Sequence, residues 1–347
     1  MKAWRVVRHG RPSLALELSK LPLPAPGAGQ IRIATRASAL NLNEVDGCHG
    51  RYKTIDPPLP YTLGMEAVGV VDAVGPPHPG ASGLEPWLGK RVALTGAGAT
   101  GAHAQAVTGD AAMAFESPPG LDDAAAAAFF FPFHVAFLSL VERGGLRAGE
   151  TLVVHAGAGG VGSAAVQLGA ALGARVIATA GGPEKVAICR ALGADLAIDY
   201  RREDFAAAVR EATGGRGADI VCDLVGGEVT RQSLSCLARG GRLMLTGFSG
   251  GIEAEDEAGL VPRPILFGNV SVCGVMLAYA PDAFPETAGL GLFPRRVGER
   301  VQERLVALLE AKQIRPVVGR TAPYTELPAE LERLERRETM GRTILRW

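Results

Sequence analysis

The stretch of residues 151–180 constrains the fold more than any other part of this chain. It begins with the apolar, β-branched run 152–154, which predicts a buried strand. Glycines follow at 157, 159 and 162 in the G-x-G-x-x-G spacing, and apolar residues at helical spacing lead from them to Gly173. Residues 175–179 predict a second strand. A strand, a glycine turn, a helix and a strand within about 30 residues predict a dinucleotide-binding unit.

Each glycine of this turn has a physical reason. Gly157 can take the positive φ of a tight turn, Gly159 lets the backbone approach a pyrophosphate, and Gly162 lets the helix pack closely against the strand. The free N–H groups and the dipole at the start of the helix then face the phosphates. The alternative is a chance glycine turn in a chain with 46 glycines. The flanking elements favour cofactor binding, and the expected binding residues are Gly157, Ala158, Gly159, Gly160, Val161 and Gly162.

Predicted strands and helices alternate from residue 151 to residue 246. The predicted helices are 183–192, 205–213 and 229–237, and the further strands are 197–199, 219–224 and 242–246. This alternation is typical of a parallel sheet covered on both faces, which is a doubly wound α/β fold. Such domains bind ligands at the C-terminal ends of their strands. Those ends carry further candidate cofactor residues, namely Val225, Gly247, Phe248 and Ser249.

The two ends of the chain have a different texture. Residues 1–123 contain short strand-like runs separated by Pro/Gly turns, which predicts a compact β-rich domain of antiparallel strands. Residues 124–143 predict a helix that is interrupted at Pro132. After Gly250 the alternation weakens, and the five strands already predicted complete the parallel sheet. We therefore expect a nucleotide-binding domain over 124–267 and a second domain formed by 1–123 together with 268–347.

Composition excludes several function classes. Lysine and arginine together number 36, as do aspartate and glutamate, so no excess charge indicates a nucleic acid or a membrane surface as partner. No secretory signal is visible, and the longest apolar run, 124–133, is too short to span a bilayer and contains Pro132. The five cysteines show no C-x-x-C spacing, which indicates reduced thiols and a cytoplasmic protein.

Taken together, these motifs resemble the zinc-free quinone oxidoreductase (zeta-crystallin-like) branch of the medium-chain dehydrogenase/reductase superfamily. The resemblance is carried by residues 39–41, 63–71, 140–149, 151–205 and 341–342, which occur in the family's order and at its spacings. It covers nearly the whole chain, and the block 151–205 is its most specific part. It implies a GroES-like substrate domain made from both chain ends, a Rossmann domain between them, and an active site in the cleft.

We expect no metal site. The zinc-using members of the superfamily carry a ligating cysteine early in the chain, a Gly-His-Glu sequence and a lobe with four cysteines. Here the early position holds Leu40 or Asn41, Met65 replaces the histidine, and no cysteine occurs between residues 91 and 123. A catalytic zinc needs three protein ligands of the Cys, His or Asp/Glu type, and a structural zinc needs four. The sequence therefore indicates hydride transfer without a Lewis acid.

The corner after the second strand indicates NADPH rather than NADH. NAD-specific sites place an Asp or Glu there to hold the ribose hydroxyls, and such a carboxylate would repel a 2′-phosphate. In this chain the corner holds Thr179 and Gly181, which are small and neutral, and Lys185 follows shortly after them. The resemblance places Lys185 and Tyr200 at the phosphate end of NADP(H). A solvated helix lysine and a packing aromatic residue are the respective alternatives.

The nicotinamide and substrate end depends mainly on the resemblance. It places Asn41 near the nicotinamide and Tyr52 at the substrate, where a phenol can donate a hydrogen bond to a carbonyl oxygen. Val135 stands where many relatives have a threonine that contacts the cofactor, so the proton donor is open. His134 could act as an acid or could simply pack in the core. Arg342 aligns with a basic residue near the phosphate end, and a surface arginine is its alternative.

We expect an enzyme that transfers hydride from NADPH to a quinone or to an α,β-unsaturated carbonyl compound, with a small hydrophobic substrate. A short-chain enoyl-CoA reductase of the acryloyl-CoA type is one alternative, for which Arg263, Arg295 or Arg296 could supply a basic approach. A non-enzymatic NADPH-binding scaffold or sensor is the other. The apolar run 270–275 suits pairing of two sheets edge to edge, which predicts a homodimer.

Overall fold

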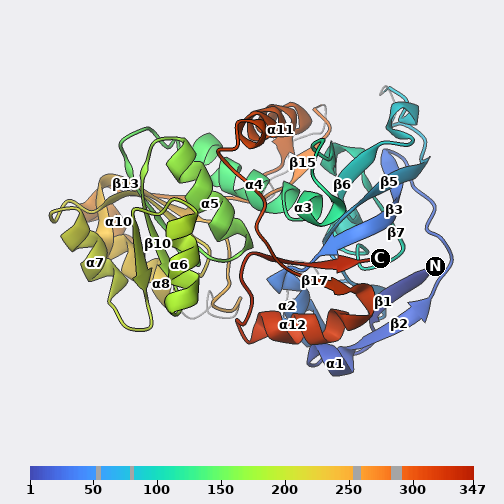
Figure 1. The fold of residues 1–347 in the computed structure, drawn as a ribbon, viewed down its shortest axis with the longest axis horizontal. Coiled ribbons are helices and arrows are strands. Elements are labelled where there is room, and N and C mark those ends of the chain that lie inside the picture. Colours follow the sequence, from blue (N-terminus) through green and yellow to red (C-terminus); the bar gives the residue numbers. More distant parts are fainter. Residues whose placement is uncertain (52–55, 79–81, 253–258, 283–290) are drawn as a thin grey trace. The chain divides into compact units, whose positions relative to one another are not determined.

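The computed structural model describes residues 1–51, 56–78, 82–252, 259–282 and 291–347 (Figure 1). The chain forms two compact units. Unit 1 comprises Met1–Phe131, Ala278–Glu299 and Pro316–Trp347, and unit 2 comprises Pro132–Leu277 and Arg300–Arg315. Unit 1 is therefore built from three separate stretches of chain, and unit 2 from two.

Unit 1 is organised around a large, mostly antiparallel sheet. Its strands follow the order β17-β18-β3-β5-β6-β8, and β7 also pairs with β3. These strands are β3 (Gln30–Ala39), β5 (Glu66–Val74), β6 (Arg91–Thr95), β7 (Ala106–Asp110), β8 (Ala114–Glu116), β17 (Val318–Pro323) and β18 (Arg342–Arg346). The last strand, β18, pairs antiparallel with β3, so Ile344 lies opposite Ala39. The C-terminal strand thus completes a sheet that the N-terminal third of the chain began.

Smaller elements surround this sheet in unit 1. A three-stranded sheet has the order β2-β1-β4, with β1 (Lys2–Val6), β2 (Leu16–Lys20) and β4 (Tyr61–Thr62). Strands β15 (Tyr279–Ala280) and β16 (Phe293–Pro294) form a short parallel pair. The helices are α1 (Pro12–Ala15), α2 (Leu42–His49), α3 (Asp123–Ala127) and α12 (Leu327–Glu335). One buried apolar cluster joins residues of β1, α2, α12 and β18, including Trp4, Val45, Leu331 and Leu345.

Unit 2 contains the predicted parallel sheet. Its order is β11-β10-β9-β12-β13-β14, and every pair is parallel. The strands are β9 (Thr151–Val154), β10 (Arg175–Ala180), β11 (Leu196–Asp199), β12 (Ala218–Asp223), β13 (Leu237–Leu245) and β14 (Ser271–Gly274). The crossover helices are α5 (Gly160–Ala171), α6 (Pro183–Ala191), α7 (Phe205–Ala212) and α8 (Glu228–Ser233), and α10 (Pro262–Gly268) precedes β14.

Helices cover both faces of this sheet, as the alternation predicts. On one face Val153, Ile177 and Val221 pack against residues of α7 and of the segment after α8. On the other face α5 lies close to the strands, because a Cβ at Gly169 would come within 2.6 Å of Leu152. Figure 1 shows α5 and α6 in front of the strands they cover. The doubly wound α/β class is therefore confirmed.

The structure departs from the predictions in three places. β14 is a sixth strand of the parallel sheet, so the sheet does not end after five strands, and residues up to Leu277 belong to unit 2. β13 begins at Leu237, inside the stretch predicted as helix, because α8 ends in a short 3₁₀ turn, Leu234–Cys236. The unit border falls at Phe131/Pro132, in contrast to the expected 123/124.

The apolar segment from Asp123 to Arg143 also differs from expectation. It consists of α3, α4 (Phe130–Phe137) and a π-helical turn, Leu138–Arg143, and it is broken at 128–129 before Pro132 is reached. By length and composition it could cross a membrane, which the sequence analysis excluded. However, 78% of its most apolar window is buried inside the protein, which is typical of a core helix.

Candidate active site

The glycine turn of unit 2 connects β9 to α5, as predicted. Gly159 is the N-cap of α5, and no side chain of the described residues caps this helix. The first N–H groups of an uncapped helix have no partner within the helix, and they carry the positive end of its dipole. The turn therefore presents a set of backbone donors suited to an anionic group.

The three glycines have different environments. A Cβ at Gly162 would lie 2.1 Å from the Ala156 carbonyl oxygen, so glycine is required for close packing of the turn. A Cβ at Gly157 would approach Ala178 and Cys189 at 3.0 Å. At Gly159 the only atom of the described residues within 4 Å would be the Ala156 carbonyl oxygen, at 3.3 Å. Gly159 thus leaves space that the protein itself does not fill.

One detail of the turn was predicted wrongly. Gly157 does not have a positive φ; the left-handed residue is Ala156, with φ of 50°. Gly157 is instead limited by its contact with the neighbouring strand and helix. Ala158 is buried, whereas Gly160 and Val161 are partly exposed beside Gly159. The segment Gly157–Gly162 therefore lies where it was expected, and the positive φ of the turn belongs to Ala156 in place of Gly157.

Two further loops lie at the same edge of the sheet. His155 donates its N–H to the carbonyl of Cys222, which brings the end of β9 beside the end of β12. Asp223, at the end of β12, accepts hydrogen bonds from the N–H groups of Val225 (2.8 Å) and Gly226 (3.1 Å). The loop after β13 is held in turn by Ser249, whose N–H donates to the Leu224 carbonyl. The structure thus gathers the predicted residues Val225, Gly247, Phe248 and Ser249 at the C-terminal edge of the strands.

At the corner after β10, a phenol and a guanidinium pack directly against Gly181. A Cβ at Gly181 would lie 2.7 Å from the Tyr200 hydroxyl and 2.9 Å from Nε of Arg201. Asp199 points its carboxylate at the backbone, accepting the N–H groups of Gly182 (3.0 Å) and Arg201 (3.1 Å). These hydrogen bonds, the Gly182 one first, hold the pKa of Asp199 below its usual value. The predicted residue Lys185 lies half-buried in the first turn of α6.

Sequence reasoning missed Arg201 as a site residue. It follows the predicted Tyr200 directly and shares the approach to Gly181. The available signal was an Arg-Arg pair at 201–202 next to a predicted strand end. The corner therefore holds a cation that the prediction did not include.

The Thr179 side chain takes part in an internal hydrogen-bond network. Its hydroxyl lies 2.9 Å from Nδ1 of His155, and Nε2 of the same ring lies 2.9 Å from the Ser233 hydroxyl. Burial lowers the pKa of His155 to about 4, against the opposing charge of Asp223. His155 is thus a neutral ring that links β9, β10 and α8. The Thr179 side chain belongs to this internal network, so only its backbone faces the turn, where its carbonyl accepts the N–H of Gly157.

His134 and Val135 are both buried in α4. Nε2 of His134 lies 2.9 Å from the side-chain oxygen of Gln302, and the ring is 0% exposed. This place in the core favours the packing interpretation of His134 over that of a proton donor. Val135 is 5% exposed.

In unit 1 the predicted residue Asn41 belongs to a buried polar cluster. Asn41 is the N-cap of α2; its side-chain oxygen accepts from Nη1 of Arg342 at 3.0 Å, and its amide donates to Glu66 at 3.5 Å. Nη2 of Arg342 also donates to the Glu66 carboxylate. Burial raises the pKa of Glu66 to about 7, although Arg342 and Asn41 oppose the change. Arg342 is therefore a buried partner of Glu66, with 7% of it exposed, and it is not the surface arginine of the alternative interpretation. Its place near the phosphate end stays a prediction.

A second buried pair adjoins this cluster. Glu44 accepts from the N–H groups of Asn41 and Met65, at 3.1 and 3.0 Å, and lies 2.9 Å from Nε2 of His103. Nδ1 of His103 lies 2.9 Å from the Ser38 hydroxyl. Burial alone would raise the pKa of Glu44, but the charge of His103 and these hydrogen bonds lower it overall. We call Asn41, Glu44, Glu66, His103 and Arg342 the buried charge cluster.

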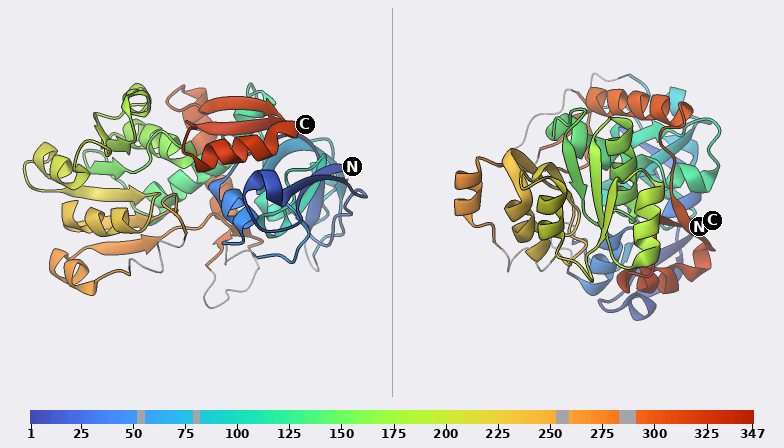
Figure 2. Two further views of the ribbon diagram at one scale, coloured as in Figure 1. Left: turned by 90° about the horizontal axis from the view of Figure 1, so that it is seen from below. Right: turned by 60° about the vertical axis from the view of Figure 1, so that its left-hand side comes forward.

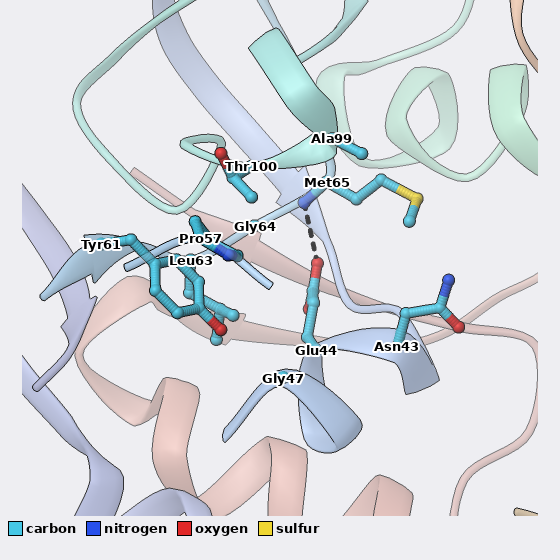
Figure 3. Close-up of a pocket in the computed structure, with 10 residues that line it drawn as sticks. All are labelled: Asn43, Glu44, Gly47, Pro57, Tyr61, Leu63, Gly64, Met65, Ala99 and Thr100. Atoms are coloured by element: carbon cyan, nitrogen blue, oxygen red, sulfur yellow. Dashed lines mark hydrogen bonds between the residues drawn. The ribbon is translucent and has the colours of Figure 1, made fainter. Parts of the chain in front are cut away.

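A pocket opens beside this cluster (Figure 3). It is lined by residues of α2, of β4 and the segments before and after it, and of the turn at 97–100: Asn43, Glu44, Gly47, Pro57, Tyr61, Leu63, Gly64, Met65, Ala99 and Thr100. Met65, which stands where zinc-using relatives have a histidine, is a wall of this pocket. Among the described residues no group of three or more His, Cys, Asp or Glu side chains could hold a metal ion. The predicted substrate residue Tyr52 lies outside the described residues.

Two family models match the chain. The model described as the alcohol dehydrogenase GroES-like domain matches residues 27–127, and that described as zinc-binding dehydrogenase matches residues 160–290. A mycobacterial protein solved in complex with NADPH is 30% identical, with a TM-score of 0.84, over 100% of both chains. The chain belongs to the medium-chain dehydrogenase/reductase family and is quinone oxidoreductase-like. The expected GroES-like and Rossmann folds are therefore confirmed.

Other relatives include quinone oxidoreductases of similar length and a much longer synthase. Escherichia coli quinone oxidoreductase, solved in complex with NADPH, is 27% identical with a TM-score of 0.84 over 100% of both chains. Human quinone oxidoreductase is 29% identical over 94% of this chain and 92% of its own. The phthioceranic/hydroxyphthioceranic acid synthase of Mycobacterium tuberculosis is 37% identical over 79% of this chain. That match covers only 12% of the synthase, so this chain spans a small part of the length of such relatives.

Proposed function

We propose that this protein is an NADPH-dependent oxidoreductase that transfers hydride, without zinc, to a quinone or to an alkene conjugated with a carbonyl group. The observation that carries the proposal is the pairing around Met65. Glu66 is bound to Arg342, Glu44 to His103, and Met65 itself offers a thioether in place of an imidazole. A catalytic zinc needs three Cys, His or carboxylate ligands facing an open position, and these side chains face one another instead.

The open backbone of unit 2 fits NADPH. The N–H groups of Gly160, Val161 and Gly162 would hold the pyrophosphate, and the unfilled space at Gly159 would let it approach. The corner formed by Gly181, Tyr200 and Arg201, with Lys185 beyond it, would hold the 2′-phosphate through charge-assisted hydrogen bonds. When bound, NADPH supplies the hydride. We further propose that Val225, Gly247, Phe248 and Ser249 line the nicotinamide half of the site, and that Asn41 and Val135 border it.

The described residues supply positioning and electrostatics rather than an obvious proton donor. Glu44 is held as a carboxylate by its donors, and His134 is buried against Gln302. Tyr52, which the resemblance places at the substrate carbonyl, remains a proposal, and which side chain would supply the proton stays open. Solvent is the alternative source.

An enoyl thioester is the second candidate substrate. It is favoured by the 37% identity to a segment of an acid synthase, which exceeds the 29% to human quinone oxidoreductase. The predicted basic approach for free CoA is weakened by Arg295, which donates to the carbonyls of Ala112 (2.8 Å) and Ala114 (2.6 Å) and lies over the Phe115 ring. Arg296 pairs with Asp282, whereas Arg263 lies on exposed α10.

We also propose that the protein forms a homodimer in the cytoplasm through the β14 edge. Among the described strands none lies outside β14, and α10 beside it exposes Leu266 (72%) and Phe267 (77%) (Figure 2). An unpaired edge strand next to exposed apolar side chains suits pairing with a second copy. Analytical ultracentrifugation tests the proposal, since a monomer at micromolar concentration would refute it.

A titration followed by turnover tests the function. Purified protein is titrated with NADPH and NADH by fluorescence, and then 1,4-benzoquinone, a simple enone and crotonyl-CoA are added in separate reactions. We expect tight NADPH binding and loss of the reduced cofactor's absorbance with at least one acceptor. Tight binding without any turnover would instead favour a scaffold or sensor.

A further inference from the structure

We propose that the Tyr61 hydroxyl binds the carbonyl oxygen of the substrate in the pocket of unit 1. We call this pocket, with the ten lining residues given above, the Tyr61 pocket. It is partly open to solvent, and its unfilled space of about 310 Å³ includes part of that solvent. The inference rests on the proposed function, because it assumes that the substrate carries a carbonyl group conjugated with the bond that is reduced.

The fold fixes the position of the Tyr61 ring. β4 pairs with β1, so that Tyr61 lies opposite Val6, and the ring packs against the buried cluster that contains Val45 and Cys48. Its hydroxyl end points toward α2, where a Cβ at Gly47 would lie only 2.8 Å from the phenol oxygen (Figure 3). Glycine at this position of α2 therefore leaves the room that the hydroxyl occupies.

The remaining lining explains why this hydroxyl is available. Tyr61 makes no side-chain hydrogen bond with any residue in the part of the chain that the structure describes. The Thr100 hydroxyl donates to the Ala97 carbonyl at 3.1 Å, and both oxygens of Glu44 accept hydrogen bonds from neighbours. Pro57, Leu63 and Met65 make the other walls apolar. A phenol at the edge of an apolar pocket suits a hydrophobic substrate with a single polar oxygen.

Tyr61 stays protonated and can donate at any ordinary pH. Burial, followed by the proximity of Cys48, Asp56 and Glu44, raises the pKa of the phenol above its usual value. Negative charge gathers on the carbonyl oxygen of an enone, quinone or enoyl thioester as its conjugated bond accepts a hydride. A hydrogen bond from a preorganised donor strengthens at that moment, so it lowers the barrier. Tyr61 keeps its proton throughout.

Tyr61→Phe is the direct test, because it keeps the ring that packs against the core. We expect kcat/KM for an enone to fall about 10- to 100-fold, with KM for NADPH unchanged. Tyr324→Phe is the matched control, since among the described residues its hydroxyl bonds only the exposed Lys2 side chain, at 2.9 Å. The control is expected to keep the wild-type value.

A binding measurement separates a bound carbonyl from a structural role. Cyclohexanone and methylenecyclohexane are compared as ligands of the NADPH complex by calorimetry. Tyr61→Phe should weaken only the ketone, by about tenfold. Gly47→Ala, whose methyl would meet the phenol oxygen, should weaken the ketone in the same way. Equal affinities of wild type and Tyr61→Phe for the ketone would overturn the inference, as would a ketone-specific loss in Tyr52→Phe alone.

The two proposals fail in different ways. If none of the acceptors supports NADPH oxidation by the wild-type protein, the proposed function fails. The calorimetric comparison then still decides the role of Tyr61. If the wild type turns over and Tyr61→Phe keeps the same kcat/KM, the inference fails and the function stands.

Discussion

The glycine turn of unit 2 leaves backbone N–H groups without a cap from any described side chain, whereas the buried charge cluster of unit 1 pairs its charged side chains with one another. At the start of α5 the helix is uncapped by any described side chain, and Gly159 leaves unfilled space. In the charge cluster, Glu44 and Glu66 are each bound to a basic side chain and to Asn41. Open backbone donors indicate a ligand from outside the chain, whereas closed charge pairs indicate structure.

This difference also shows why a charged residue near an active site need not act on the substrate. Arg342 is expected from the family at the phosphate end, yet its two terminal nitrogens, Nη1 and Nη2, donate to Asn41 and Glu66. Arg201, which the prediction did not include, packs against Gly181. We therefore propose Arg201, in place of Arg342, as the cation that meets the cofactor.

Removing Arg342 should have the largest effect. Arg342→Met leaves Glu66 buried without its cation, and we expect a loss of about 3–5 kcal/mol in the free energy of unfolding, measured with urea. The double variant Glu66→Leu with Arg342→Met removes both charges and should recover much of that loss. If the single variant Arg342→Met is as stable as the wild type, Arg342 does not stabilise the buried Glu66.

The next largest effect should be the contribution of Glu66 to the pH dependence of the unfolding free energy. Its pKa is raised from 4.5 to about 7 in the folded protein, so between these values the folded state binds more protons than the unfolded state. Stability should therefore fall as pH rises from 4.5 to 7, with a slope from this group of up to about 1.4 kcal/mol per pH unit. Glu66→Gln should lack this part of the slope in urea unfolding. Identical slopes in both proteins would contradict the assignment.

Substitutions at two glycines of the turn should separate packing from ligand binding. Gly162→Ala places a methyl 2.1 Å from the Ala156 oxygen, and we expect a loss of about 1–3 kcal/mol in unfolding free energy. Gly159→Ala should leave stability within about 0.5 kcal/mol of the wild type but weaken NADPH binding, because the methyl enters space that the protein does not fill. The distinction would be lost if Gly159→Ala destabilised the fold as strongly as Gly162→Ala.

The Gly181 corner should give the smallest effect. Arg201→Ala and Lys185→Ala each remove a charged donor, and we expect about a tenfold rise in the Kd for NADPH with little change for NADH. Arg202→Ala is the matched control, because Arg202 is an exposed neighbour whose atoms are not among the three nearest to a Cβ at Gly181. Fluorescence titration measures the Kd of each variant for NADPH and for NADH. An equal rise in the Kd for NADH would show that Arg201 does not bind the 2′-phosphate.

The sequence predicted the features that depend on neighbours along the chain. The strand, turn and helix at 151–171 follow from local periodicity and glycine spacing, and the structure has them where expected. The buried charge cluster was not predicted, since Arg342 lies 301 residues from Asn41 and no local pattern joins them. The φ of Ala156 and the break in the helix before Pro132 depend on tertiary packing, which periodicity does not report. Likewise, β14 joins the sheet by pairing with β13 after a long connection.

The most direct test of the central claim is the oxidation of NADPH and NADH by metal-free protein. The protein is treated with a chelator, and turnover with benzoquinone, an enone and crotonyl-CoA is followed for each cofactor. NADPH should be the preferred cofactor, turnover should survive chelation, and added zinc should not raise it. Preference for NADH, or activity that disappears with the chelator and returns with zinc, would contradict a zinc-free NADPH-dependent reductase.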